Sequence, residues 1–192
     1  KNIRFFLLLF FFPFVGLSSA PFSRFTGKQA EWKGFQKTTF KVGEYEAFVV
    51  QPKRTAEGKP WVWRARFPTF HSEIDEMLLA DGYHVAHINA GKRLGSPTAL
   101  NIWKQFYDLL TEKHGLNKKV VLEGVSRGGL YVYRWAKAYP ETVACIYNDT
   151  PVCDLKSWPG GMGVGKGAQR EWKRVIVEYG FKNEGLKQRF LQ

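Results

Sequence analysis

The segment from residue 120 to residue 140 constrains the fold of this chain more than any other. It begins with Val120–Leu122, a short apolar run of the kind that forms a buried parallel strand. Gly124-Val125-Ser126-Arg127-Gly128 follows. Residues 130–138 then have the apolar spacing of a helix that stops before Pro140. A strand, a glycine-flanked serine and a helix in this order predict a sharp turn that exposes the serine hydroxyl above a sheet.

A serine in such a turn is suited to nucleophilic catalysis. Small residues at 124 and 128 let the backbone turn sharply and let the helix approach the strand. The helix N-terminus also favours negative charge that develops beside it. We therefore predict that Ser126 is a nucleophile. The same letters can form a glycine-rich turn with a capping serine, and they identify only one member of a catalytic triad.

Length and composition limit the possible classes of protein. A chain of 192 residues holds at most one domain, and 44% hydrophobic with 16% aromatic residues is ample for a packed core. The 29 Lys and Arg exceed the 17 Asp and Glu by 29 − 17 = 12. These basic residues are scattered rather than clustered, so we expect a cationic, solvated surface and no nucleic-acid site.

The N-terminal residues are predicted to be a separate unit. Residues 1–20 combine two early positive charges, a phenylalanine- and leucine-rich stretch and a small-residue end, as in a secretory signal peptide. The apolar stretch is short for a membrane span, although an uncleaved anchor is the alternative. We expect a secreted or periplasmic protein without stable membrane association after cleavage. Residues 21–36 are predicted to be irregular, and residues 37–192 to form a partial domain.

The rest of the chain alternates between strand and helix patterns. We expect a hairpin of strands 38–42 and 45–50, a strand at 61–67, a helix at 72–80, a strand at 83–88, a helix from Ser96-Pro97 to Gly115, a buried strand at 143–147 and a helix at 168–178. An antiparallel start followed by strand–helix–strand units predicts an α/β protein, with a mostly parallel sheet and helices on both faces. Cys145 is expected to be a buried thiol, although export would permit a disulfide with Cys153.

These features resemble secreted bacterial serine hydrolases of the α/β-hydrolase fold. The resemblance covers residues 37–155 and rests on the order of strands and on short motifs. The motifs are Trp61–Phe67, Gly95-Ser96-Pro97, Gly124–Gly128, Tyr147–Asp154 and Trp158–Gly161.

The resemblance implies acyl transfer through an acyl-enzyme on Ser126, with no metal or organic cofactor. It also implies an oxyanion hole formed by the Arg127 N–H and by an N–H after the third strand. Because Pro68 has no N–H, this second donor must be Phe67 or Thr69, and we choose Phe67. The implied substrate is a small-molecule or carbohydrate ester. Aromatic rings that could stack on sugars belong to Trp158 and to Trp61, Trp63 or Trp103, although a core role suits most of them better.

The sequence departs from the pattern in its acid and base. The family order is serine, acid, histidine, but His71, His84, His87 and His114 all precede Ser126. Only His71 is expected near the site. Asp149, at the end of a predicted strand, is the candidate acid, and Asp154 is a weaker one.

We therefore expect an incomplete sequence that lacks the C-terminal strands, with the base histidine beyond residue 192. Two other functions stay open at this stage: a catalytically inactive binding protein of this fold, and a serine peptidase of the same fold.

Overall fold

A seven-stranded mixed sheet organises residues 24–181, the part of the chain that the computed structural model describes. The predicted signal segment lies outside these residues. Within them the strand order is β1-β2-β3-β5-β4-β6-β7. The strands are β1 (Lys28–Trp32), β2 (Phe35–Val42), β3 (Tyr45–Gln51), β4 (Trp61–Arg64), β5 (His84–Ile88), β6 (Val120–Val125) and β7 (Val143–Asp149).

The first three strands form an antiparallel meander, and the predicted hairpin is confirmed. Strands β2 and β3 pair from Gln36 with Gln51 to Val42 with Tyr45, and Gly43 has a positive φ of 59° in the turn. Strand β3 is antiparallel to β5, whereas the β5–β4, β4–β6 and β6–β7 pairs are parallel.

The prediction that residues 21–36 are irregular is wrong for β1. Residues 28–32 pair antiparallel with β2 through a turn in which Lys33 and Gly34 both have positive φ. Four of the five β1 side chains are exposed. A strand with little burial carries no hydrophobic alternation, so its sequence gives no strand pattern.

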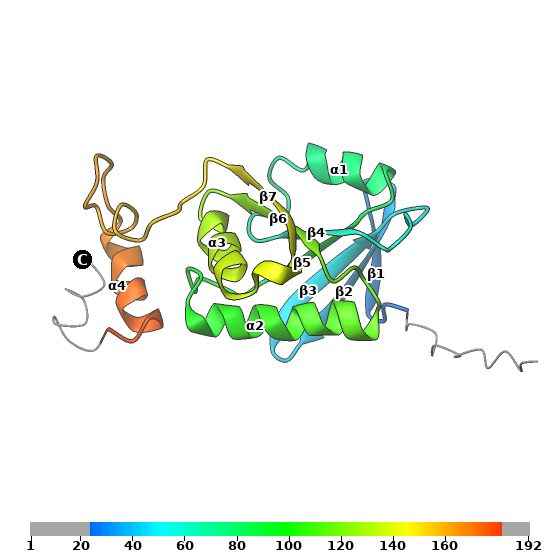
Figure 1. Cartoon of the computed structure of the whole chain (residues 1–192), viewed down its shortest axis with the longest axis horizontal. Helices are drawn as coiled ribbons and strands as arrows, with labels where there is room; N and C mark the ends of the chain where they lie inside the picture. The colour runs from blue at the N-terminus through cyan, green and yellow to red at the C-terminus, as the bar shows by residue number, and fades with distance from the viewer. Residues whose placement is uncertain (1–23, 182–192) are drawn as a thin grey trace, which may run out of the picture.

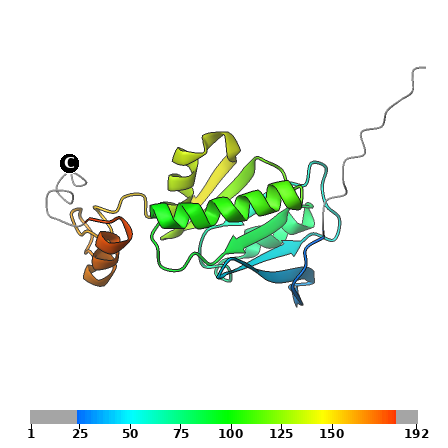
Figure 2. The same cartoon turned by 90° about the horizontal axis from the view of Figure 1, so that it is seen from below.

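Helices cover both faces of the sheet, as predicted. They are α1 (Glu73–Ala80), α2 (Pro97–Asp108), α3 (Gly128–Ala138) and α4 (Gln169–Glu178), with a π-helical turn η1 (Leu109–Lys113) after α2 and a 3₁₀ turn η2 (Pro140–Thr142) after α3. Helix α1 lies on one face, and α2 and α3 lie on the other (Figure 1). Seen from below, α2 runs across the sheet in front of the strands (Figure 2). Ser96 is the N-cap of α2, as predicted: its Oγ accepts a hydrogen bond from the Ala99 N–H at 3.3 Å.

Alternation along β4 divides the core between the two faces. Val62 packs with Leu79 of α1. Trp61 and Trp63 belong to the larger cluster on the α2 and α3 side. There the Trp63 ring stacks on Trp103 at a centroid distance of 4.1 Å and meets Trp135 edge-on at 4.9 Å. Trp61, Trp63 and Trp103 are at most 1% exposed, so these three are core residues and not sugar-stacking surfaces.

Two predictions about β4 and β7 are wrong. The strand predicted at 61–67 ends at Arg64, because the chain turns away from the sheet and Phe67 has a φ of 53°. Strand β7, predicted to be buried, has mostly exposed side chains, since β6 is its only strand neighbour among the described residues. Cys145, predicted to be a buried thiol, is therefore exposed; Cys153, which follows β7, is exposed as well, and both are free thiols.

The tryptophan cluster predicts a large loss of stability on truncation. Trp63→Ala removes a fully buried ring and should lower the free energy of unfolding by about 3–5 kcal/mol. Met77→Ala, on the exposed side of α1, should change it by about 0.5 kcal/mol or less. Urea unfolding followed by circular dichroism measures both. Equal effects of the two changes would contradict this account of the core.

Candidate active site

Ser126 occupies a sharp turn between β6 and α3, as the sequence predicts. Its φ is 50°, in the left-handed region that side chains other than glycine rarely adopt. The Ser126 N–H donates to the Asp149 carbonyl at 3.0 Å, and the Ser126 carbonyl accepts from the N–H groups of Gly129 and Val152 at 3.0 and 2.8 Å. Backbone hydrogen bonds from both sides therefore fix the strained residue, and the partly exposed serine follows directly after buried β6.

Close approach of backbone segments makes Gly129 essential to this turn. A Cβ at Gly129 would lie 2.6 Å from the Val152 carbonyl oxygen and 2.7 Å from Pro151 Cβ. A Cβ at Gly128 would meet Ala65 Cβ at 3.4 Å, which is ordinary contact. The prediction that residue 124 must be small is confirmed, because a Cβ at Gly124 would overlap Asn148 Oδ1 and lie 2.9 Å from Val132 Cγ2. The structure shows that Gly129 brings the segment after β7 against the start of α3.

The loop after β4 lies beside the sharp turn at residues 124–128 that carries Ser126, called the elbow below. The Arg127 guanidinium lies 5.4 Å from the centre of the Phe67 ring and 5.8 Å from that of Trp158. The Phe67 carbonyl accepts hydrogen bonds from Arg64 Nε at 3.1 Å and from the Phe70 N–H at 3.0 Å. The N–H groups of Phe67 and Arg127, predicted as the oxyanion hole, take part in none of these bonds and belong to neighbouring segments.

The two candidate acids differ in their surroundings. Asp149 is the last residue of β7 and pairs beside Val125. Its carbonyl braces Ser126, and among residues 24–181 its half-buried carboxylate has no hydrogen bond or ion pair. The Asp154 carboxylate accepts from the N–H groups of Lys156 and Ser157 at 2.9 and 3.2 Å. Asp154 is therefore a turn residue.

The four histidines make no hydrogen bond to Ser126 within residues 24–181. His84 begins β5 and His114 precedes β6, so both lie at the edge of the parallel strands opposite Ser126, where their rings contact Phe25. His87 Nδ1 lies 2.8 Å from the Arg64 carbonyl oxygen. Burial lowers the pKa of His84 and of His87 to about 4.

His71, in the loop after β4, is the histidine on the Ser126 side. Its side chain is 62% exposed, and its Nδ1 lies 3.9 Å from a carboxylate oxygen of Glu73. The structure therefore brings the predicted serine, both predicted N–H donors and Asp149 to one edge of the sheet. A histidine that could activate the serine is not among the partners of that serine.

A buried charge cluster beside the elbow was missed by the sequence analysis. Arg64, Asp75 and Glu123 are each at most 2% exposed. Arg64 forms ion pairs with Asp75 and with Glu123 Oε1, the latter at 2.9 Å. The sequence signal for this cluster was a charged residue inside each of the apolar runs 61–67 and 120–125. Pairing of β4 with β6 places these two residues, Arg64 and Glu123, directly opposite each other.

The cluster holds two carboxyl groups for one guanidinium. Asp75 Oδ1 and Glu123 Oε2 are buried and accept no hydrogen bond from an N–H group of the described residues. Burial raises the pKa of both carboxyls, that of Glu123 to about 8, with the neighbouring Asp75 adding to the effect. A proton on Glu123 that is donated to Asp75 satisfies both oxygens, and leaves one negative charge against Arg64.

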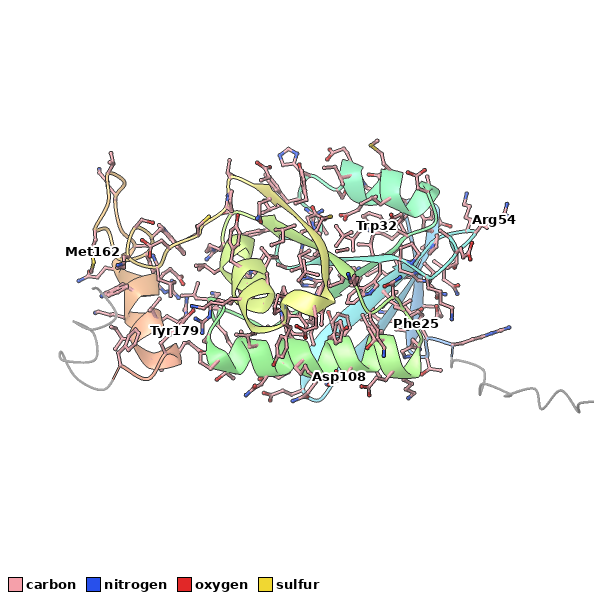
Figure 3. All side chains as sticks on the ribbon, in the orientation of Figure 1. Phe25, Trp32, Arg54, Asp108, Met162 and Tyr179 are labelled. Atoms are coloured by element: carbon pink, nitrogen blue, oxygen red, sulfur yellow. The ribbon has the colours of Figure 1, made fainter. Side chains whose placement is uncertain are left out.

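The C-terminal end of helix α4 packs against the loop between β5 and α2. Glu178 accepts hydrogen bonds from Arg93 Nη1 at 3.3 Å and from Ser96 Oγ at 3.2 Å, and the Tyr179 hydroxyl donates to the Leu94 carbonyl at 2.9 Å. Tyr179 lies on the side of α4 that faces the sheet, whereas Met162, in the segment before α4, lies on the side away from the sheet (Figure 3).

Residues 24–181 contain no group of three or more His, Cys, Asp or Glu side chains that could hold a metal ion. No helix in the same range is long and apolar enough to cross a membrane.

Comparison with known proteins finds similarity at the level of the fold. No protein-family profile and no curated protein sequence matches the chain. Among solved structures, an esterase from Pyrococcus furiosus matches at 14% identity over 80% of this chain and 68% of its own, with a TM-score of 0.52. An acetyl xylan esterase from Aspergillus awamori matches at 12% identity over 77% and 68%, with a TM-score of 0.50. A mutant esterase matches at 17% identity over 82% and 59%, with a TM-score of 0.54.

The chain spans 42%, 46% and 49% of the length of three further matched chains. Strand order, helices on both faces and the three esterase matches with TM-scores of 0.50–0.54 show that the chain has the α/β-hydrolase fold. At identities of 12–17%, the shared property is the fold alone.

The glycine pair at the start of α3 gives a matched test of the turn. Gly129→Ala should lower the free energy of unfolding by about 1–3 kcal/mol, because the new methyl overlaps the backbone at Val152. Gly128→Ala should change it by about 0.5 kcal/mol or less. Chemical unfolding of the two variants checks the contrast, and a Gly129→Ala protein as stable as the wild type would refute this packing.

The buried carboxyl pair predicts a dependence of stability on pH. The folded state holds the Glu123 proton up to about pH 8, whereas the unfolded chain releases it near the ordinary glutamate pKa of 4.5. This contribution to stability is therefore complete below about pH 4.5 and is lost as the pH rises towards 8, by at most about 1.4 kcal/mol per pH unit.

Glu123→Gln mimics the protonated carboxyl and should remove this loss. Denaturant unfolding of both proteins between pH 5 and 8 measures the difference, which should grow with pH in favour of the variant. A difference that does not change with pH would show that Glu123 is ionised throughout this range.

Proposed function

We propose that this protein is an exported serine hydrolase that cleaves an ester through an acyl-enzyme on Ser126. The observation that carries the proposal is the left-handed backbone of Ser126, at a sharp turn between a buried parallel strand and the N-terminus of a helix. Such a conformation is costly for serine, and it is maintained where it presents a hydroxyl for chemistry.

The proposed reaction begins with attack of Ser126 Oγ on the acyl carbonyl carbon of the ester. The carbonyl oxygen becomes negatively charged in the tetrahedral intermediate, and the N–H groups of Arg127 and Phe67 are the proposed donors to it. Collapse of the intermediate expels the alcohol and leaves the acyl group on Ser126. Water then attacks this acyl-enzyme, which releases the acid and restores the serine hydroxyl.

A general base must accept the Ser126 proton and return it to the leaving alcohol. None of the four histidines hydrogen bonds to Ser126 within residues 24–181, so we assign none of them to this role. Asp149 stays the proposed acid, because its half-buried carboxylate has no other partner in the described part of the chain and lies at the end of β7, next to the elbow.

An acylated carbohydrate is the proposed substrate class. Of the four tryptophans considered for stacking on a sugar, only Trp158 supports this choice. Its half-buried ring lies against Arg127 beside the elbow, whereas the other three are core residues. The match to an acetyl xylan esterase is consistent with this choice. Export is proposed from the signal-like residues 1–20.

A binding protein that retains the elbow without catalysis is the second candidate. It is favoured by one observation, that no histidine among residues 24–181 hydrogen bonds to Ser126. A peptidase is the third possibility, because a dipeptidyl aminopeptidase structure from Bacteroides ovatus also matches, with a TM-score of 0.51 over 22% of its chain.

Labelling with a fluorophosphonate probe tests the proposal on the product of the complete gene. The wild-type protein should be labelled and should hydrolyse a 4-nitrophenyl ester faster than the matched anilide. Ser126→Ala should abolish labelling and lower the rate of ester hydrolysis by about 10³-fold or more, because the attacking oxygen is lost.

Ser157→Ala serves as the control. Its hydroxyl is exposed and donates to the Asp154 carbonyl, so labelling and turnover should persist. Labelling that survives in Ser126→Ala would reject the proposed nucleophile. A wild-type protein that binds carbohydrate esters but is neither labelled nor active would favour the binding protein, and preference for the anilide would favour a peptidase.

A further inference from the structure

The loop formed by residues 66–71 connects β4 to α1 and contains the proposed second donor of the oxyanion hole. Phe67 and His71, near its two ends, have left-handed φ values of 53° and 49°. Thr69, Phe70 and His71 are exposed, with Phe70 at 52%. In the first half of the loop, Arg66 Nη1 donates to the Gly91 carbonyl at 2.6 Å, but the exposed side chains of the second half do little to hold it in place.

The Arg64 guanidinium supplies hydrogen bonds that span the loop. Its Nε donates to the Phe67 carbonyl at 3.1 Å, its Nη2 donates to the Phe70 carbonyl, and both Nη atoms lie 3.4 Å from the His71 carbonyl oxygen. One rigid, planar group thus contacts three carbonyls, including those of both strained residues. The fixed fork of arginine suits this task, since lysine carries all its donors on a single atom.

Two carboxyls hold the guanidinium in turn. Glu123 lies opposite Arg64 on β6, three residues before Ser126, and Asp75 comes from α1. A buried guanidinium without acid partners would be very costly, so these contacts fix its orientation as well as its charge. The elbow strand and the loop are therefore connected through a single side chain.

We infer that Arg64 is a positioning residue for catalysis, which fixes the Phe67 N–H relative to Ser126 by binding the carbonyls of the 66–71 loop. This inference rests on the proposed function and adds a residue to it. Arg64 is 1% exposed, so it acts through the loop and does not contact the substrate.

A misplaced oxyanion donor weakens binding of the transition state more than binding of the substrate. Loss of the Arg64 contacts should therefore lower kcat and leave KM nearly unchanged. A purely structural residue would instead change stability without this selective effect on kcat.

Arg64→Lys tests the inference in the complete protein, because it keeps the charge and removes the fork. We expect kcat for a 4-nitrophenyl ester to fall by about 10–100-fold, with KM within about twofold of the wild-type value. Amide hydrogen exchange should accelerate in residues 66–71 and stay unchanged in β6. Arg93→Lys is the matched control, since Arg93 lies on a different loop, between β5 and α2, and pairs with Glu178 of α4. This control should change neither kcat nor exchange in the 66–71 loop by more than about twofold.

Wild-type kcat and wild-type loop exchange in Arg64→Lys would overturn the inference. If Arg64→Lys does not fold, a pair of variants at Glu123 decides. Glu123→Gln keeps an acceptor for Arg64 and should retain kcat within about threefold, whereas Glu123→Met should lose about 10-fold or more at constant KM. Equal kcat values in these two variants would also overturn the inference.

The outcome for the proposed function is separate. If the wild-type protein is neither labelled by fluorophosphonate nor active, the proposed function fails. Loop exchange in Arg64→Lys then still reports whether Arg64 holds the loop.

Discussion

The left-handed backbone of Ser126 costs roughly 1–3 kcal/mol, and hydrogen bonds from neighbouring segments maintain it. The Asp149 carbonyl accepts a hydrogen bond from the Ser126 N–H, and the N–H groups of Gly129 and Val152 donate to the Ser126 carbonyl. The turn therefore depends on the parallel pairing of β6 with β7, which places the end of β7 within reach. Close packing at Gly129 leaves no room for a side chain between α3 and the segment after β7.

The loop on the other side of the elbow is held by a different kind of force. Whereas backbone hydrogen bonds fix Ser126, a buried guanidinium between two carboxyls fixes the loop that carries Phe67. Buried ions contribute less to stability than an apolar core of similar volume, and they are sensitive to the loss of any one partner. Placing such a cluster three residues before the serine favours definite geometry over stability, as expected beside the catalytic centre that we propose.

Much of this arrangement could be predicted from the sequence, because it depends on local patterns. The turn at residues 124–128, the hairpin at Gly43 and the Ser96 cap each have a short-range signal. Strand β1 has no such signal, since its side chains are mostly exposed. The apolar residues of β7 predict burial, but burial of a strand also depends on what packs beside it, and most β7 side chains are exposed. The Arg64 cluster joins residues 64, 75 and 123, so it follows from strand register and not from spacing along the chain.

The central claim, that Ser126 is the nucleophile of an acyl-enzyme, is tested most directly by trapping that intermediate. The complete protein would be mixed with excess 4-nitrophenyl acetate, quenched in acid within the first turnovers, digested and examined by mass spectrometry. Our account predicts a single acetyl group on the peptide that contains Ser126, formed together with a burst of nitrophenol. Ester hydrolysis without acetylation of that peptide, or with acetylation elsewhere, would contradict it.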